Sequence, residues 1–178
     1  MKLKLLIASL LSALPFVEAA DIKTAWGTGG QALTCTLASL ANNGARACTA
    51  VDNSTNKFVR AKFFLKVKSG ASSTSATGYV DLFAGGSVNG GTTYTENFGG
   101  TDAAFTFTVP PNIKWIGTCN VVVDATTYYC GPFPVELAFG GTLPTNWFIV
   151  ISNKSGGTLD STEGNHAKLW QGEYVTVQ

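Results

Sequence analysis

The chain has 178 residues, which is enough for one domain with a substantial core but hardly for two. Only 13% of the residues are charged and the formal net charge is +1, so no strong field can attract nucleic acid or an anionic membrane. This composition argues against a nonspecific nucleic-acid-binding protein. Twenty glycines and 11% aromatic residues are instead typical of an all-β domain with many turns.

Residues 1–20 differ from the rest of the chain. Two lysines precede an apolar run from Leu5 to Val17, and Val17-Glu18-Ala19 provides small residues where a signal peptidase reads them. The pattern predicts a cleaved secretory signal, with the mature chain starting near Ala20. An uncleaved apolar arm that packs on a neighbouring subunit is the alternative. The run is shorter than the roughly 20 residues of a membrane-spanning helix, so we expect membrane contact only through an uncleaved leader.

Residues 21–178 are predicted to form one domain of about ten short strands, because turn signals recur every 8–12 residues or so. In chain order, the predicted strands are 31–37, 46–51, 58–68, 76–84, 92–95, 104–109, 113–123, 127–129, 133–139, 147–152 and 167–177. Segment 147–152 is almost wholly apolar, which indicates a buried strand. The regular spacing predicts a single-domain antiparallel β-sandwich, jelly-roll-like or immunoglobulin-like.

The longest predicted strand, Phe58–Lys68, has the clearest two-residue period. One face is wholly apolar and must lie on a core, which implies a second sheet; it consists of Val59, Ala61, Phe63, Leu65 and Val67. The other face carries four cations and two phenyl rings: Phe58, Arg60, Lys62, Phe64, Lys66 and Lys68. This basic face is the leading candidate for an interaction surface, and a merely solvated face is the alternative.

The tryptophans and tyrosines allow two interpretations. They could form a sugar-stacking platform. Trp115, Trp147 and Trp170 lie within predicted strands, however, and are better interpreted as core or subunit-interface anchors. We count Trp170 with the four cations of the basic face as a candidate interface residue.

The four cysteines, Cys35, Cys48, Cys119 and Cys130, lack the spacing of a metal-binding CxxC pattern, and three disulfide connectivities are formally open. A turn midway between each local pair would set its cysteines opposite each other on neighbouring strands, which favours 35–48 and 119–130 if the chain is exported. A strict two-residue turn would place Cys119 and Cys130 in the wider type of strand pair, whereas a four-residue turn would not. Four buried thiols are expected in a reducing compartment.

No set of residues stands out as a catalytic or metal-binding site. His166 is the only histidine and lies near Glu163, but no serine or cysteine nucleophile stands beside them. The segment from Asp160 to Glu163 could offer oxygen ligands to calcium, although a loop with local Asx and Ser/Thr turns is the preferred interpretation. We therefore expect no catalytic residues, cofactor or metal.

Five stretches outside the leader form a characteristic set: Leu37–Ala50 (LASLANNGARACTA), Val51–Asn56 (VDNSTN), Ser69–Val80 (SGASSTSATGYV), Gly90–Tyr94 (GGTTY) and, most strongly, Asn153–Gly172 (NKSGGTLDSTEGNHAKLWQG). As a set they resemble a family of small structural proteins of tailed bacteriophages. The resemblance implies a capsid-decorating or cement-type β-sandwich that binds the capsid exterior and has no enzymatic activity. It implies no binding residues position by position.

Two functional hypotheses follow. The first is a noncatalytic virion structural protein on the capsid exterior, a homo-oligomer whose partners are the major capsid protein or other virion proteins. The second is an exported β-sandwich, secreted or held at a cell surface, that binds glycans or a cell surface. The leader, the four cysteines and the aromatic residues motivate the second hypothesis.

Overall fold

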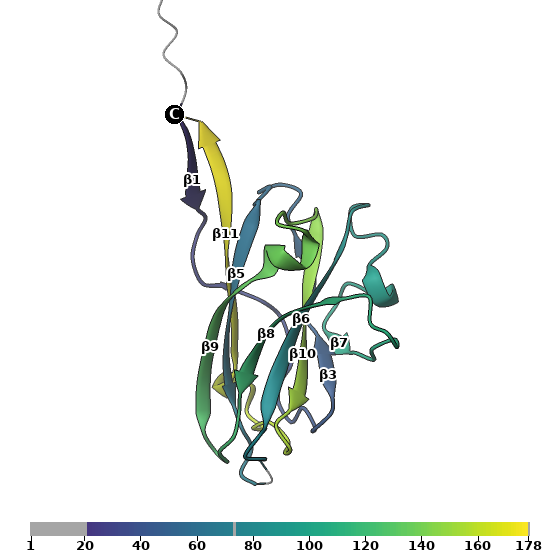
Figure 1. The fold of residues 1–178 in the computed structure, drawn as a ribbon, viewed down its shortest axis with the longest axis vertical. Helices are drawn as coiled ribbons and strands as arrows, with labels where there is room; N and C mark the ends of the chain where they lie inside the picture. Colours follow the sequence, from purple (N-terminus) through teal and green to yellow (C-terminus); the bar gives the residue numbers. More distant parts are fainter. Residues whose placement is uncertain (1–20, 73, 178) are drawn as a thin grey trace, which may run out of the picture.

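The alternating pattern of the sequence folds into two antiparallel β-sheets packed face to face (Figure 1). The computed structural model describes residues 21–72 and 74–177, so the predicted leader lies outside the described residues. Within these ranges the chain forms eleven strands and three short 3-10 helices. The predicted all-β, antiparallel sandwich is therefore confirmed. No helix in the described ranges is long and apolar enough to cross a membrane.

The first sheet has the strand order β1-β11-β5-β9, and β2 also pairs with β11. Its strands are β1 (Ile22–Trp26), β2 (Gln31–Ala32), β5 (Arg60–Lys68), β9 (Thr127–Pro134) and β11 (Ala167–Val177). The second sheet has the order β7-β3-β10-β6-β8, and β4 also pairs with β10. Its strands are β3 (Ala45–Ala47), β4 (Val51–Asp52), β6 (Tyr79–Ser87), β7 (Ala103–Ala104), β8 (Lys114–Asn120) and β10 (Asn146–Lys154). The 3-10 helices are η2 (Thr95–Asn97), η3 (Val135–Phe139) and η4 (Glu163–Asn165).

The core lies between the two sheets. The inward side chains of β5 are completely buried, as the alternation predicts: Ala61, Phe63, Leu65 and Val67. They face the inner sides of β6 and β10, and the rings of Trp147 and Trp170 meet edge to face with centroids 5.2 Å apart. Burial of these large apolar side chains supplies the main stabilisation of the sandwich.

Strand β10 is buried on both faces, which explains its continuous apolar run. The side chains of Trp147, Ile149 and Ile151 belong to the central core. Phe148 and Val150 point to the opposite side of the second sheet, where a smaller cluster covers them. That cluster uses phenyl rings from the segment between β6 and β8, namely Phe98, Phe105 and Phe107. The segment thus forms a partial third layer.

Two predicted strands in this covering segment are wrong. Residues 92 and 93 form bends and Thr95 begins η2, and of 104–109 only Ala104 belongs to a strand, the two-residue β7. The alternation of AFTFTV is real, because Phe105 and Phe107 both pack on the second sheet. The alternation directs both phenyl rings to the same side, but the described chain pairs only two residues here, in β7, with a neighbouring strand. Similarly, the predicted strand 133–139 consists of the end of β9 followed by η3.

The two disulfides join the sheets at opposite edges of the sandwich. Cys119 lies in β8, the edge of the second sheet, and Cys130 lies in β9, the edge of the first, with their Cα atoms 5.6 Å apart. At the other edge Cys35 follows β2 and Cys48 follows β3, with a Cα separation of 4.4 Å. The favoured pairing is thus present, but the predicted hairpin geometry is wrong. Cys119 and Cys130 belong to different sheets, because the chain crosses between the sheets after Cys119, and Cys35 and Cys48 lie just outside the strands.

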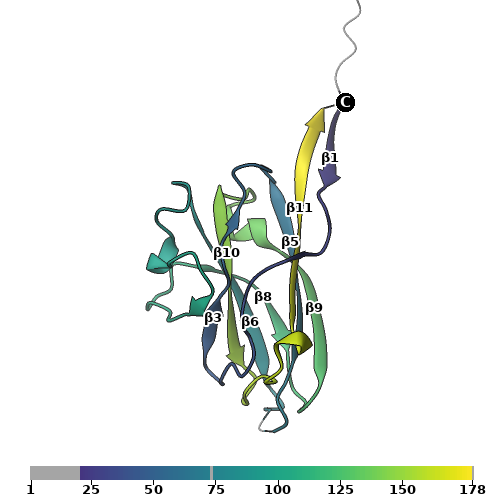
Figure 2. The same ribbon diagram turned by 180° about the vertical axis from the view of Figure 1, so that it is seen from behind.

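Strands β1 and β11 extend beyond the body of the sandwich as a two-stranded ribbon (Figures 1 and 2). The register between β11 and β5 ends at the pair of Glu173 with Arg60. From there to Val177, β11 pairs only with β1, in a register that starts at the pair of Ile22 with Val177. The sequence did not predict β1, and we refer to residues 22–26 and 173–177 as the ribbon.

Candidate interaction surface

The basic face of β5 lies on the outside of the first sheet, as predicted, but its charge is largely compensated. Three of its four cations make ion pairs with carboxylates: Arg60 with Glu173 at 3.6 Å, Lys62 with Glu136 at 3.6 Å, and Lys68 with Asp160 at 3.2 Å. The carboxylates of Glu173 and Glu136 belong to buried residues. None of these pairings could be read from the sequence, because the partners are distant along the chain.

Lys66 differs from the other three cations, because the described part of the chain gives it no ion pair. It lies opposite Tyr129 of β9, whose side chain is 70% exposed. The ring of Tyr129 also lies 6.4 Å from that of Phe64. Lys66, Tyr129 and Phe64 therefore form the partly exposed centre of this face, where a cation without an ion pair in the described chain stands beside two aromatic rings.

Two residues assigned to this face lie in the core instead. Trp170 is only 6% exposed and faces inward, so it is not available to a partner. Phe58 is buried as well, and its ring packs against Trp170 and Tyr174. The alternation fails at Phe58 because β5 begins only at Arg60, after Lys57 has taken a positive φ of 52°. The ring of Phe58 also lies on the backbone of two glycines, where a Cβ would collide with it: Gly27 and Gly172.

Of the other tryptophans, Trp147 is a core residue and Trp115 is a surface residue. Trp147 is completely buried, as its interpretation as a core residue predicts. Trp115 is 59% exposed on the outer side of the second sheet. Its indole Nε1–H donates to Asp81 at 3.3 Å and to Thr118 at 3.1 Å, which fixes the ring orientation. Trp115 therefore remains a candidate surface anchor.

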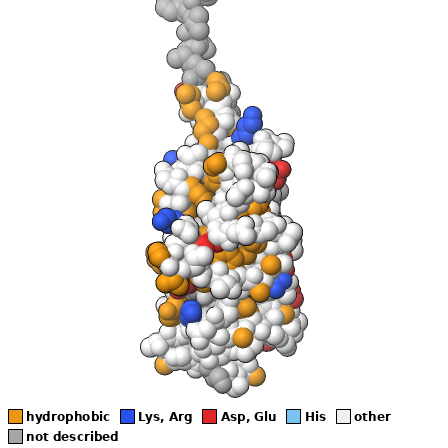
Figure 3. Space-filling view, turned by 90° about the vertical axis from the view of Figure 1, so that its right-hand side faces the viewer, with side chains coloured by type: hydrophobic (Ala, Val, Ile, Leu, Met, Phe, Trp, Pro, Cys, Tyr) orange, Lys and Arg blue, Asp and Glu red, His pale blue; other side chains and the backbone are white. Residues whose placement is uncertain are grey.

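The ribbon exposes an apolar face that sequence reasoning missed. Directly opposed residues of an antiparallel pair lie on the same face. Ile22 therefore shares a face with Val177, and Val175 and Trp26 lie along the same face. Ile22 is 75% exposed and Trp26 48%, and several hydrophobic side chains lie on the face of the ribbon that Figure 3 shows. The signal available in the sequence was the two large apolar residues at the ends of IKTAW, Ile22 and Trp26.

A groove of about 770 Å³ lies at the base of the ribbon. Its walls combine aromatic rings with amide and hydroxyl side chains, from Trp26, Thr28, Gln31, Thr55, Asn56, Phe58 and Tyr174, together with Gly27. Rings beside amide groups can hold a ligand that has both apolar and hydroxyl-bearing faces. Trp26 belongs to both the groove and the apolar face of the ribbon.

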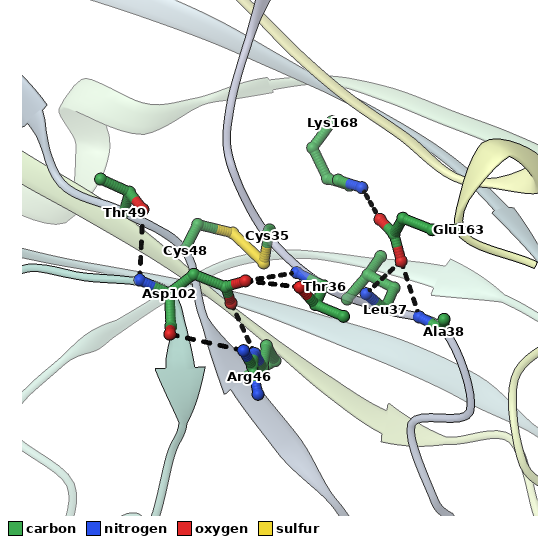
Figure 4. The surroundings of a disulfide bond; sticks show 10 residues. All are labelled: Cys35, Thr36, Leu37, Ala38, Arg46, Cys48, Thr49, Asp102, Glu163 and Lys168. Atoms are coloured by element: carbon green, nitrogen blue, oxygen red, sulfur yellow. Dashed lines mark hydrogen bonds and ion pairs between the residues drawn. A yellow bond between two sulfur atoms is a disulfide. The ribbon is translucent and has the colours of Figure 1, made fainter. Parts of the chain in front are cut away.

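Two carboxylates fix the chain beside the Cys35–Cys48 disulfide, as Figure 4 shows. Asp102 accepts hydrogen bonds from the backbone N–H and the hydroxyl of Thr36, at 3.0 and 2.6 Å, and pairs with Arg46. Burial acts to raise the pKa of Asp102, but the hydrogen bonds from Arg46 and Thr36 outweigh it and hold that pKa below its usual value. This network stabilises one edge of the sandwich.

Glu163 has a similar structural role and does not form a dyad with His166. One oxygen of Glu163 accepts the N–H groups of Leu37 and Ala38, both at 2.7 Å, while the other accepts from Lys168. Burial acts to raise the pKa of Glu163, but the hydrogen bonds from Lys168, Ala38 and Leu37 outweigh it and hold that pKa below its usual value. No group of three or more His, Cys, Asp or Glu side chains in the described ranges is placed to hold a metal ion.

His166 bridges two backbone groups from a buried position. Its Nδ1 accepts the N–H of Lys68 at 3.3 Å, and its Nε2 lies 3.1 Å from the carbonyl oxygen of Asp160. With Nδ1 accepting, the neutral ring carries its proton on Nε2 and donates it to that carbonyl. Burial lowers the pKa of His166 from its usual 6.5.

His166 is therefore expected to make the protein less stable in mildly acidic solution. The folded protein binds the His166 proton less tightly than the unfolded chain does. Its contribution to stability is complete above about pH 7 and is lost as the pH falls through 6.5 towards the lowered pKa of the folded state. Thermal unfolding between about pH 7.5 and 5.5 should show this loss, and the His166→Gln variant should flatten it. An equal slope in the variant would assign the pH dependence to other groups.

No model of a known protein family matches the chain, and no curated protein matches it.

Proposed function

We propose that this chain is a noncatalytic virion structural protein that decorates or cements the exterior of a bacteriophage capsid as a homo-oligomer. The resemblance of five stretches to small phage structural proteins motivates the role. The observation that carries the proposal is the ribbon, which extends beyond the body of the sandwich with an apolar face and with strand edges that no other described strand pairs. Soluble proteins normally cover or shorten such edges, so an exposed one favours an assembly element.

The outer face of the first sheet is the proposed contact with the major capsid protein. Its partly exposed centre joins Lys66 to the rings of Tyr129 and Phe64, a combination that suits a protein interface. Lys62 is less suitable as a probe, because an acidic side chain there would stand beside the buried carboxylate of Glu136. A charge reversal at Lys66 breaks no ion pair within the described residues.

The Lys66→Glu variant is expected to reduce capsid occupancy about fivefold while leaving the fold intact, because reversing one charge at an interface weakens association without touching the core. Occupancy can be measured by quantitative mass spectrometry of particles incubated with the purified variant. The matched control is Lys114→Glu, an exposed lysine on the second sheet, which should bind as the unmodified protein does. If both variants bind the capsid as well as the unmodified protein does, the basic face is merely solvated.

Electron microscopy and mass spectrometry of purified particles test the virion role directly. The proposal expects density for a two-sheet body on the capsid exterior and peptides of this chain in the particle. Absence of the chain from particles would overturn the proposal.

The groove at the base of the ribbon favours a second candidate function, an exported β-sandwich that binds glycans at a cell surface. Trp26 and Tyr174 supply rings, and Gln31 and Asn56 supply amide groups. The two disulfides, which tie the sheets at opposite edges, are typical of exported proteins. A mature N-terminus near Ala20, together with glycan binding that Trp26→Ala abolishes, would support this candidate over the first; an intact Met1 would count against export.

A further inference from the structure

The outer edge of β1 carries backbone hydrogen-bonding groups that no strand of the described chain takes up, since β1 ends the first sheet. Gly27 N–H donates to the carbonyl oxygen of Gly172 at 2.8 Å. This bond shows which residues of β1 direct their backbone groups towards β11 and which direct them away. Successive residues direct their backbone groups to opposite sides of a strand. Ile22, Thr24 and Trp26 therefore direct their N–H and C=O groups away from β11, to the open edge.

Strand β1 is complementary to a second copy of itself. In an antiparallel pairing centred on Thr24, the two Thr24 residues face each other and each Ile22 faces the Trp26 of the other copy. All of these residues direct their backbone groups to the open edge, so the pairing can form about six hydrogen bonds across a two-fold axis. A register centred on Lys23 would oppose two lysines, and one centred on Ala25 would leave Ile22 unpaired.

The side chains favour the same register. Ile22, Thr24 and Trp26 lie on the apolar face of the ribbon. The pairing would place the exposed Trp26 ring of one copy beside the exposed Ile22 of the other, an aromatic–aliphatic pair that stabilises sheets. Lys23 would face Ala25, so no like charges are directly opposed, and each Lys23 keeps its ion pair with Asp21.

The shape of the molecule leaves room for this contact. The ribbon extends beyond the body of the sandwich, so no other strand of the described residues lies along the outer edge of β1 (Figures 1 and 2). Because the pairing is antiparallel, the two bodies would lie at opposite ends of the joined ribbons. Strand addition at an open edge is a common mode of protein association, in which backbone hydrogen bonds supply affinity and side chains supply register.

We propose that the partner of the ribbon is a second copy of this chain, joined by two-fold antiparallel pairing of β1 with β1 centred on Thr24. The pairing makes one continuous sheet from the first sheets of two molecules. This inference deepens the proposed function, on which it rests for the role of the ribbon as an assembly element. Its test uses the isolated protein, whereas the virion role is tested on particles, so the two can fail separately.

Charge substitutions at Thr24 provide the test. The Thr24 side chain is exposed and its backbone groups point away from β11, so Thr24→Lys and Thr24→Glu should both preserve the ribbon. Sedimentation velocity of the full chain at tens of micromolar should show a dimer for the unmodified protein. Each variant alone should dimerise at least about tenfold more weakly, because like charges then face each other across the axis. An equimolar mixture of the two variants should recover the dimer, since Lys and Glu are then opposed.

The matched control is Thr92→Lys, an exposed threonine outside the ribbon, which should remain dimeric. Circular dichroism of all variants should match the unmodified protein. The proposal is overturned if the unmodified protein is monomeric throughout, if the Thr24 variants dimerise as it does, or if the mixture stays monomeric while each variant does.

Discussion

Replacing both Cys35 and Cys48 by serine is expected to lower the free energy of unfolding by about 3 kcal/mol. The two residues are separated by 13 positions, and closing a loop of this size removes entropy from the unfolded chain. The disulfide also joins the two sheets at one edge, where it supports the segment that Asp102 and Glu163 fix. Urea unfolding followed by tryptophan fluorescence measures the change.

The second disulfide provides the control. Cys119 and Cys130 are separated by 11 positions, so their replacement should cost a similar amount. Reduction of the unmodified protein should then lower stability more than either replacement does. If reduction leaves the urea unfolding midpoint unchanged, the disulfides do not stabilise the folded protein, and the prediction is wrong.

Trp147→Ala is expected to cost about 4 kcal/mol, because it removes a completely buried ring and leaves a cavity that the surrounding strands can fill only in part. The ring lies in the central core and meets Trp170 edge to face at 5.2 Å. The change can be measured by the same urea unfolding, with the fluorescence of the remaining tryptophans as the signal.

Trp115→Ala is the matched control for this substitution. It removes the same side chain from another strand, but from a position that is 59% exposed, so the loss should stay below about 1 kcal/mol. Comparable losses for the two variants would contradict the assignment of Trp147 to the core and Trp115 to the surface.

The sequence predicts those parts of the fold in which the hydrophobic pattern of a strand matches its burial, whether on one face or on both. The inward face of β5 and the apolar run of β10 are of this kind, and both lie where the pattern places them. The covering segment between β6 and β8 shows the limit of this reasoning. Phe105 and Phe107 alternate as in a strand, yet they pack as irregular chain, because alternation reports which side is buried and not whether a neighbouring strand exists.

The candidate surface was less predictable, because it depends on contacts between distant residues. Period alone places Lys62 and Arg60 on an outer face, but it cannot reveal that Glu136 and Glu173 compensate them. Trp170 shows a related difficulty. The period of its strand gives two faces without saying which is inward, and only the packing against Trp147 decides it. Strand β1 was missed because it is too short to form without β11.

The antiparallel pairing of β1 with β11 also determines how the molecule carries a pulling force. Tension applied between Ile22 and Val177, which face each other, would act across the ribbon and open its hydrogen bonds one after another rather than all together. The body of the sandwich would remain closed, because covalent bonds hold both of its edges. The ribbon would therefore open at a low pulling force, whereas the disulfide-linked sandwich would stay folded.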